Sequence, residues 1–168
     1  MSDGTHPGEV RRQIEGCIFK MVIDNVAKRN SFTPDMMMQL SEAMTEFDKC
    51  DELWVAVLCA EGEHFTAGID MPKFLGPGAS ATPTTEDSVD PFALRNRSIK
   101  PIITAVQGIT YTLGIELMLA GDIVVAADTA RFCQMEAKCG IAPLAGRAFS
   151  LSDTHGVGRR DVPSDAVR

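Results

Sequence analysis

Residues 100–146 constrain the fold more than any other stretch, because short apolar runs alternate there with one helix-forming segment. The first run, residues 102–106, is rich in β-prone residues and is closed by Gly108. A helical segment follows at 112–120, and a second apolar run covers residues 123–127. Strands separated by a short helical segment predict a β-α-β crossover, which favours a buried, largely parallel sheet. The expected fold class is therefore α/β.

The segment at 112–120 would carry apolar side chains on nearly every side of a helix. A helix with that pattern is expected to be buried. Glu116 lies within it, where a carboxylate is costly unless it is paired or used. The residues alone leave two interpretations about equally open: a buried structural carboxylate, or a functional acid or base.

Composition and charge bound the class of protein. The 168 residues suffice for one domain with a real core, and 45% hydrophobic with 23% charged residues is ordinary for a soluble globular protein. No apolar run approaches the ~20 residues of a membrane span. Residues 1–12 lack the apolar core of a secretory signal. The formal net charge of −7 disfavours nonspecific nucleic-acid binding.

Cysteine and histidine usage addresses disulfides and metals. The five cysteines are odd in number, include no C-x-x-C pair, and have no clustered histidine beside them. This pattern argues against a disulfide framework and against a zinc site. We therefore expect reduced thiols, no metal and a cytoplasmic location.

Local patterns predict the elements that surround the central stretch. Two strands are expected within residues 10–24. Thr33, Pro34 and Asp35 are typical of a helix start, and apolar residues at helical spacing extend that helix to residue 50. The remaining expectations are a loose terminus at 1–8, a buried strand at 54–60, a turn at 61–70, short helices at 71–75 and 91–97, and a mobile surface loop at 76–89.

Several motifs follow one another in a recognisable order. HFTAGID at 64–70 follows a strand, and KP at 100–101 opens the next one. GITYTLGIELMLAGDIVVA and ARFCQMEAKCGIAP come after it. In this order and spacing they resemble the crotonase superfamily, in particular its enoyl-CoA hydratases, over about residues 10–146. The resemblance implies a crotonase-like ββα spiral with two roughly perpendicular sheets, followed in the family by C-terminal helices that build trimers or hexamers.

The resemblance also implies an oxyanion hole made by two backbone N–H groups, those of Ile69 and Leu113. Aimed at a thioester oxygen, such donors stabilise an enolate, and the N-terminus of a helix adds its dipole. The family often has small residues at these positions, so Leu113 would narrow the pocket. Without the resemblance, TAGID would be interpreted as an ordinary turn built on Gly68.

Two carboxylates match the hydratase pattern. Glu116 aligns with one acid/base position of the family and Glu136 with the other. By this analogy Glu116 holds and activates the water, and Glu136 handles the proton at C2 of the substrate. On sequence grounds alone, Glu136 is more simply a surface charge, solvated or paired with Lys138.

The expected substrate is an acyl-CoA thioester, with no cofactor besides. Its CoA part should lie across the turn that contains TAGID, with basic residues near the phosphates. For these basic residues a solvated turn is at least as good an interpretation. The residues expected to bind CoA are Lys28, Arg29, Thr66, Ala67, Gly68, Ile69, Asp70, Met71 and Gly114.

The resemblance ends at Gly146, so we expect a core of residues 1–146 whose C-terminal helical part is missing. Residues 147–168 are polar and lack a sustained helical period, which predicts a disordered tail. Codons for this tail can be chosen so that a neighbouring frame encodes a family-like helix. A frameshift is therefore the expected origin of the tail, and a genuine gene end is the alternative.

Three functions remain possible at this point. The first is an active enoyl-CoA hydratase, which would be a homotrimer or hexamer if full-length. The second is an enoyl-CoA isomerase that uses Glu136 alone. The third is an inactive fragment that binds acyl-CoA or associates with full-length relatives.

Overall fold

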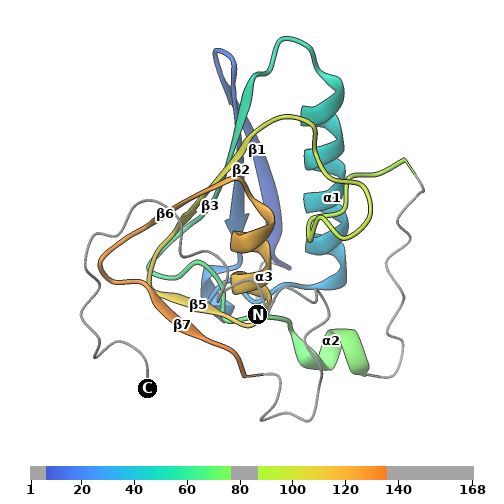
Figure 1. The fold of residues 1–168 in the computed structure, drawn as a ribbon. Helices are drawn as coiled ribbons and strands as arrows, with labels where there is room; N and C mark the ends of the chain where they lie inside the picture. Colours follow the sequence, from blue (N-terminus) through green and yellow to red (C-terminus); the bar gives the residue numbers. More distant parts are fainter. Residues whose placement is uncertain (1–6, 77–86, 136–168) are drawn as a thin grey trace, which may run out of the picture.

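A computed structural model describes residues 7–76 and 87–135 of the chain. Its main body is a five-stranded sheet with the order β1-β2-β3-β4-β6, and a two-stranded sheet pairs β5 with β7 (Figure 1). The strands are β1 (Glu9–Glu15), β2 (Ile18–Asp24), β3 (Val55–Ala60), β4 (Ile102–Val106), β5 (Ile109–Tyr111), β6 (Ile123–Ala126) and β7 (Arg131–Cys133). The helices are η1 (Val26–Lys28), α1 (Pro34–Lys49), α2 (Met71–Leu75) and α3 (Leu113–Ala120).

Parallel pairing dominates the sheet, as the central stretch predicted. β1 and β2 form an antiparallel hairpin, whereas β2–β3, β3–β4 and β4–β6 are all parallel. The connection from β4 to β6 carries α3, so the predicted β-α-β crossover is confirmed. Two neighbouring parallel strands cannot be joined by a tight hairpin turn, so the chain must cross over the sheet between them.

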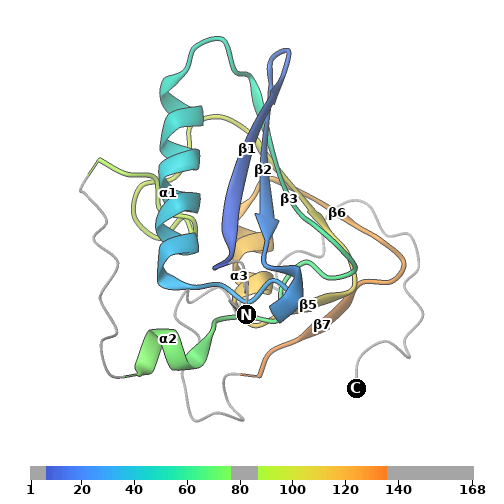
Figure 2. The same cartoon turned by 180° about the vertical axis from the view of Figure 1, so that it is seen from behind.

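Helix α1 begins as its sequence predicted. The Thr33 side chain accepts a hydrogen bond from the Met36 N–H at 3.2 Å, and Pro34 occupies the first helical position. The helix packs beside β1 and β2, and Figure 2 shows it running along the hairpin. It buries Met36, Met37, Leu40, Ala43, Met44 and Phe47 in the core.

The end of α1 is held by the segment that leads into β4. Lys100 donates from Nζ to the carbonyl oxygens of Phe47 and Cys50, at 3.1 and 2.6 Å. A cation there satisfies terminal carbonyl groups and opposes the negative end of the helix dipole. This contact ties α1 to the entrance of the central strand.

Helix α3 is buried on all sides, as its composition predicted. Every residue from Leu113 to Met118 is buried, Glu116 included. The helix lies against β4 and β5, close to the middle of the molecule (Figure 1).

The expectations for Trp54 and for residues 91–97 are wrong. Trp54, expected inside a buried strand, precedes β3 and has 69% of its surface exposed. Residues 91–97 form turns instead of a helix. The Asp90 carboxylate accepts from the N–H groups of Phe92, Leu94 and Arg95, and such side-chain bonds offer the backbone an alternative to the helix.

The predicted loop and termini lie partly outside the described residues. Val89, at the end of the predicted mobile loop, is buried, and its carbonyl oxygen accepts from Ser41 Oγ at 2.6 Å. Gly8, in the predicted loose terminus, is buried against α1 and the turn at Asn25. Residues 1–6, 77–86 and 136–168, including the predicted tail at 147–168, are not among the described residues.

Strand β6 is exposed, although its apolar run was expected to be buried. Ile123, Val124 and Val125 have 54%, 41% and 56% of their surface exposed. The strand lies at the edge of the five-stranded sheet, paired with β4 on one side. Successive side chains of a strand point to opposite faces, so both faces of the sheet are uncovered here among the described residues.

Two further features concern membranes and thiols. Within residues 7–76 and 87–135, no helix is both long and apolar enough to cross a membrane. The described cysteines Cys17, Cys50, Cys59 and Cys133 are free thiols. Burial raises the pKa of the Cys59 thiol, so this residue of β3 stays protonated at neutral pH.

We predict that the 168-residue chain self-associates through β6, because an exposed apolar edge strand is a template for pairing. Val125→Lys should weaken association, since lysine on an edge strand disfavours strand addition. Ile99→Lys adds the same charge at a residue that is 86% exposed outside β6, and should have little effect. Sedimentation velocity over a concentration series measures this; a monomer at every concentration, or equal effects of both variants, contradicts the prediction.

Candidate active site

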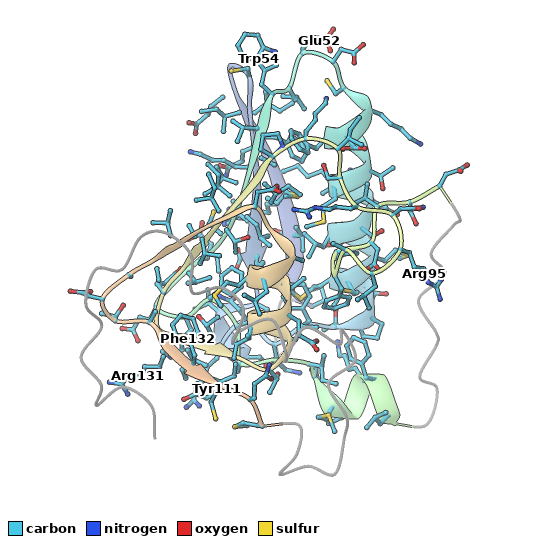
Figure 3. The ribbon with its side chains drawn as sticks, viewed as in Figure 1. Glu52, Trp54, Arg95, Tyr111, Arg131 and Phe132 are labelled. Carbon is cyan, nitrogen blue, oxygen red and sulfur yellow. The ribbon has the colours of Figure 1, made fainter. Side chains whose placement is uncertain are left out.

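The turn that follows β3 is attached to β5 through the main chain of Thr66. The Thr66 N–H donates to the Ile109 carbonyl and the Tyr111 N–H donates to the Thr66 carbonyl, both at 3.0 Å. This isolated parallel bridge brings the 66–70 segment to the start of α3, because β5 leads directly into that helix. Figure 3 shows Tyr111 at this end of the molecule, far from Glu52 and Trp54 at the other.

Gly68 and Thr112 meet where the two segments touch. Gly68 has φ +110°, a value that favours glycine, and a methyl group on its α-carbon would overlap Thr112 Oγ1. Thr112 itself has φ 48° and ψ −109°, a conformation that β-branched residues rarely adopt. Its N–H donates to the Cys133 carbonyl at 2.9 Å, and its carbonyl accepts from Ile115 N–H at 2.9 Å. The chain thus holds a strained residue directly before α3.

The predicted oxyanion donors lie on these two segments. Phe32 pairs with the residues on either side of Ile69, accepting from Asp70 at 2.7 Å and donating to Gly68 at 2.8 Å. In such a parallel bridge, Phe32 bonds to both neighbours of Ile69, and the N–H and carbonyl groups of Ile69 itself point away from Phe32. Within the described residues, neither the Ile69 N–H nor the Leu113 N–H donates a hydrogen bond. Both are therefore available to an acceptor.

Glu116 lies in the first turn of α3, three residues after Leu113. Only 4% of its surface is exposed. Its backbone N–H approaches the Thr112 carbonyl at 3.3 Å, so the strained residue also begins the turn that carries Glu116. The positive end of a helix dipole favours a negative charge at this position.

Glu136, the second predicted carboxylate, lies outside the described residues. The described chain leads toward it through β7, which pairs in parallel with β5 and places Cys133 opposite Tyr111. The residues just before Glu136 therefore run beside the start of α3. The arrangement of the two carboxylates stays a prediction.

The predicted CoA-binding residues gather around the same turn. Lys28 and Arg29 are exposed, and the Arg29 carbonyl accepts from Ala67 N–H at 3.0 Å. Lys28 Nζ pairs with the buried Asp70 carboxylate at 2.8 Å. Among the other residues, Met71 starts α2 and Gly114 lies buried in α3. A basic exposed edge thus borders a segment with buried polar groups.

Asn30 is a residue of this site that sequence reasoning missed. It is 1% exposed, and its Nδ2 donates to the carbonyl oxygens of Glu61 and His64 at 2.8 and 2.7 Å. Its Oδ1 accepts from the Asn25 N–H at 2.7 Å. The available signal was asparagine in a polar turn, since asparagine adopts the left-handed backbone more readily than most residues, and here φ is 56°.

A separate pocket lies away from this site, near the C-terminal end of α3. It is lined by residues of α1, β3 and β4, by the 89–98 segment and by Leu117, Ala120 and Gly121. None of the predicted site residues that the structure describes lines it. Among the described residues, no group of His, Cys, Asp and Glu side chains is arranged to hold a metal ion.

Comparisons with known proteins agree on one family. The family described as enoyl-CoA hydratase/isomerase matches residues 13–162, past the Gly146 at which we placed the end of the resemblance. "Probable enoyl-CoA hydratase 1, peroxisomal" of Arabidopsis thaliana is 34% identical over 82% of this chain and 51% of its own length. "1,2-Epoxyphenylacetyl-CoA isomerase" of Escherichia coli K12 is 29% identical over 87% of this chain and 58% of its own.

A solved structure gives the same result for the fold. A probable enoyl-CoA hydratase/isomerase from Mycobacterium abscessus has a TM-score of 0.80 and 36% identity, covering 89% of this chain and 58% of that chain. The α/β fold expected from the resemblance is therefore confirmed as crotonase-like. The chain spans little more than half the length of the proteins it matches.

We predict that Gly68→Ala destabilises the protein more than Gly16→Ala does. Gly16 also has a positive φ, +62°, but nothing lies within 4 Å of a methyl group added there. Gly68→Ala should lose about 1–3 kcal/mol more, because the added methyl group overlaps Thr112 and because φ +110° suits alanine less well than the +62° of Gly16. Urea unfolding measures the difference; equal losses in the two variants would mean that Gly68 and Thr112 are not in contact.

We also predict that Thr112→Gly stabilises the protein by about 1 kcal/mol, because the strain at Thr112 exceeds the entropic cost of glycine. Thr129→Gly is the control, since Thr129 lies in an exposed turn without a positive φ and should lose stability. A lower thermal midpoint for Thr112→Gly than for the wild type would contradict the inference that the backbone of Thr112 is strained.

Proposed function

Because the chain belongs to the enoyl-CoA hydratase/isomerase family, we propose that it acts on a CoA thioester and adds water to a trans-2-enoyl-CoA. The observation that carries this proposal is the pair of N–H groups on Ile69 and Leu113. Each is without an acceptor in the described residues, and the two segments that bear them are joined through Thr66. Glu116 lies buried one turn into the helix that begins at Leu113.

The two N–H groups would bind the thioester oxygen. When water attacks C3, the electron pair of the C2–C3 bond moves toward the carbonyl, and the oxygen gains negative charge as an enolate forms. Preorganised donors stabilise that charge more than the ground-state carbonyl, which lowers the barrier. Leu113 adds the positive end of the α3 dipole.

The two glutamates would divide the proton transfers. Glu116 holds the water and takes its proton as the oxygen bonds to C3. Glu136 delivers a proton to C2 as the enolate returns to the thioester. Water and proton then add to the same face of the double bond. A carboxylate buried in an apolar helix is suited to this work, because a dry environment strengthens its interaction with the water.

The CoA part of the substrate would lie along the 66–71 segment. The main-chain polar groups of this turn face the adenine in our proposal, and the exposed Lys28 and Arg29 meet the phosphates. Arginine suits phosphate oxygens because its guanidinium donates two parallel hydrogen bonds. The ion pair between Lys28 and Asp70 keeps the lysine beside the turn before substrate arrives.

Isomerisation is the second candidate function, favoured by one observation. The family description includes isomerases, and one relative is named as an isomerase of a CoA thioester. In that reaction Glu136 alone would shuttle a proton between two carbon atoms, and Glu116 would not need to activate water. The oxyanion donors would serve both reactions.

Other parts of the proposal concern the surroundings of the site. We propose that no cofactor takes part besides the CoA of the substrate, that the family's trimer or hexamer is the active assembly, and that the protein is cytoplasmic. The third interpretation, an inactive fragment that binds acyl-CoA or associates with relatives, is the alternative to activity.

We predict that Glu116→Gln and Glu136→Gln each lower the hydration of crotonyl-CoA by about 10²–10⁴-fold, the range for acid/base groups. Crotonyl-CoA binding should survive, because neither carboxylate holds CoA. Glu46→Gln, at an exposed carboxylate of α1 that pairs with Arg12, is the control and should leave turnover unchanged.

The loss of enoyl absorbance follows hydration, and calorimetry follows binding. Unchanged turnover in either site variant rejects the pair of carboxylates. Lost hydration with retained double-bond migration in Glu116→Gln assigns the isomerase function. Binding without any turnover in the wild-type chain assigns the inactive fragment.

A further inference from the structure

We propose that Thr66 is a positioning residue, whose hydroxyl and methyl groups hold the Ile69 and Leu113 N–H groups in fixed relation to each other. The proposal rests on the proposed function, because it names what aligns the two donors of the oxyanion hole. Three sets of contacts carry it, made by the hydroxyl group, the main chain and the methyl group of Thr66.

The hydroxyl group shapes the segment that carries Ile69. Thr66 Oγ1 donates to the Asn30 carbonyl at 2.7 Å and accepts from the Gly68 N–H at 3.1 Å. It therefore closes a tight turn directly before Ile69 and fastens that turn to Asn30. Thr66 is fully buried, so water does not compete for either bond.

The main chain and methyl group of Thr66 reach the other donor. The N–H and carbonyl groups of Thr66 bond to Ile109 and Tyr111 of β5, which leads into α3. Its Cγ2 lies so close to Gly114 that a methyl group added there would be 2.7 Å from it. Gly114 follows Leu113 directly, so one side chain contacts both donor segments.

Asn30 extends this connection away from the site. Its side chain bonds to the carbonyl oxygens of Glu61 and His64, at the start of the turn that Thr66 closes. The Asn30 carbonyl is the acceptor of the Thr66 hydroxyl. The turn is thus fixed at its beginning by Asn30 and in its middle by Thr66, which limits the positions that Ile69 can take.

Two neighbouring threonines show that burial alone does not explain this arrangement. Thr104 in β4 and Thr110 in β5 are also fully buried, yet their hydroxyl groups have no hydrogen-bond partner among the described residues. In those positions threonine serves as a packing residue of suitable shape. At Thr66, by contrast, the hydroxyl both donates and accepts.

The first test measures amide exchange in the 168-residue chain. Thr66→Val keeps the shape and removes the hydroxyl, whereas Thr66→Ser keeps the hydroxyl. Thr66→Val should accelerate exchange about tenfold at Gly68 and Asp70, in line with the loss of a buried hydrogen bond. Thr66→Ser, which lacks the methyl group beside Gly114, should accelerate exchange at Ile115 and Glu116 instead. Thr66→Ser should restore protection at Gly68 and Asp70. Thr104→Val, which removes an unpartnered hydroxyl, is the control and should leave these amides unchanged.

The exchange pattern distinguishes positioning from general stability. Acceleration confined to the two donor segments supports the proposal. Equal acceleration in α1, for example at the Met37 amide that bonds to Thr33, would mean a purely structural role and overturn it. This result does not depend on enzymatic activity.

The second test measures polarisation of a bound substrate. Two aligned donors should shift the absorption of bound cinnamoyl-CoA, a conjugated enoyl thioester, to longer wavelength. Thr66→Val should bind this compound with a shift at most half that of the wild type, and Thr104→Val should retain it. An unaltered shift in Thr66→Val overturns the positioning role. No shift in the wild type would reject the proposed function, and the exchange experiment would then decide the role of Thr66.

Discussion

The bridge between Thr66 and β5 is the contact on which the site depends. It consists of two main-chain hydrogen bonds at 3.0 Å, to Ile109 and from Tyr111. It is reinforced by the Phe65 N–H, which donates to the Gln107 carbonyl at 2.8 Å, and together these bonds hold the turn after β3 against the chain that leads into α3. Through these bonds, the available N–H groups of Ile69 and Leu113, the buried Glu116 and the exposed Lys28 and Arg29 belong to one region. The parallel sheet supports this bridge, because β3 and β4 deliver both segments to the same end.

Backbone strain at this junction must be offset elsewhere in the fold. The positive φ of Thr112 is unfavourable by about 1–3 kcal/mol, whereas Gly68 adopts its positive φ without such a cost. The apolar side chains of α3 supply the compensation, since burying one leucine or isoleucine contributes about 1.5–3 kcal/mol. Leu113, Ile115 and Leu117 are all buried in the core. The apolar character of α3 therefore also holds a strained residue against the oxyanion segment.

Local chemistry explains which predictions from sequence succeeded. Thr33 and Pro34 start α1 through contacts within one helical turn, and the apolar runs of β4 and α3 are buried as their patterns predicted. The prediction of a helix at 91–97 failed because the Asp90 carboxylate accepts hydrogen bonds from three following N–H groups. Such side-chain competition leaves no periodic pattern in the sequence. The prediction that the 123–127 run is buried failed because burial of β6 depends on what covers it. Among the described residues, nothing covers this strand.

The sequence by itself determined the fold class, the order of the elements and the identity of the candidate residues. Glu116 stood out as a carboxylate within an apolar helical segment, whereas TAGID and Glu136 were identified through the resemblance of the sequence to the crotonase superfamily. Both kinds of signal persist in an unfolded chain. Only the tertiary structure decided that Ile69 and Leu113 have N–H groups without acceptors in the described residues, that Asn30 is buried and that Thr66 contacts both donor segments. These properties are relations between segments far apart in the chain, and they exist only once the sheet has brought those segments together.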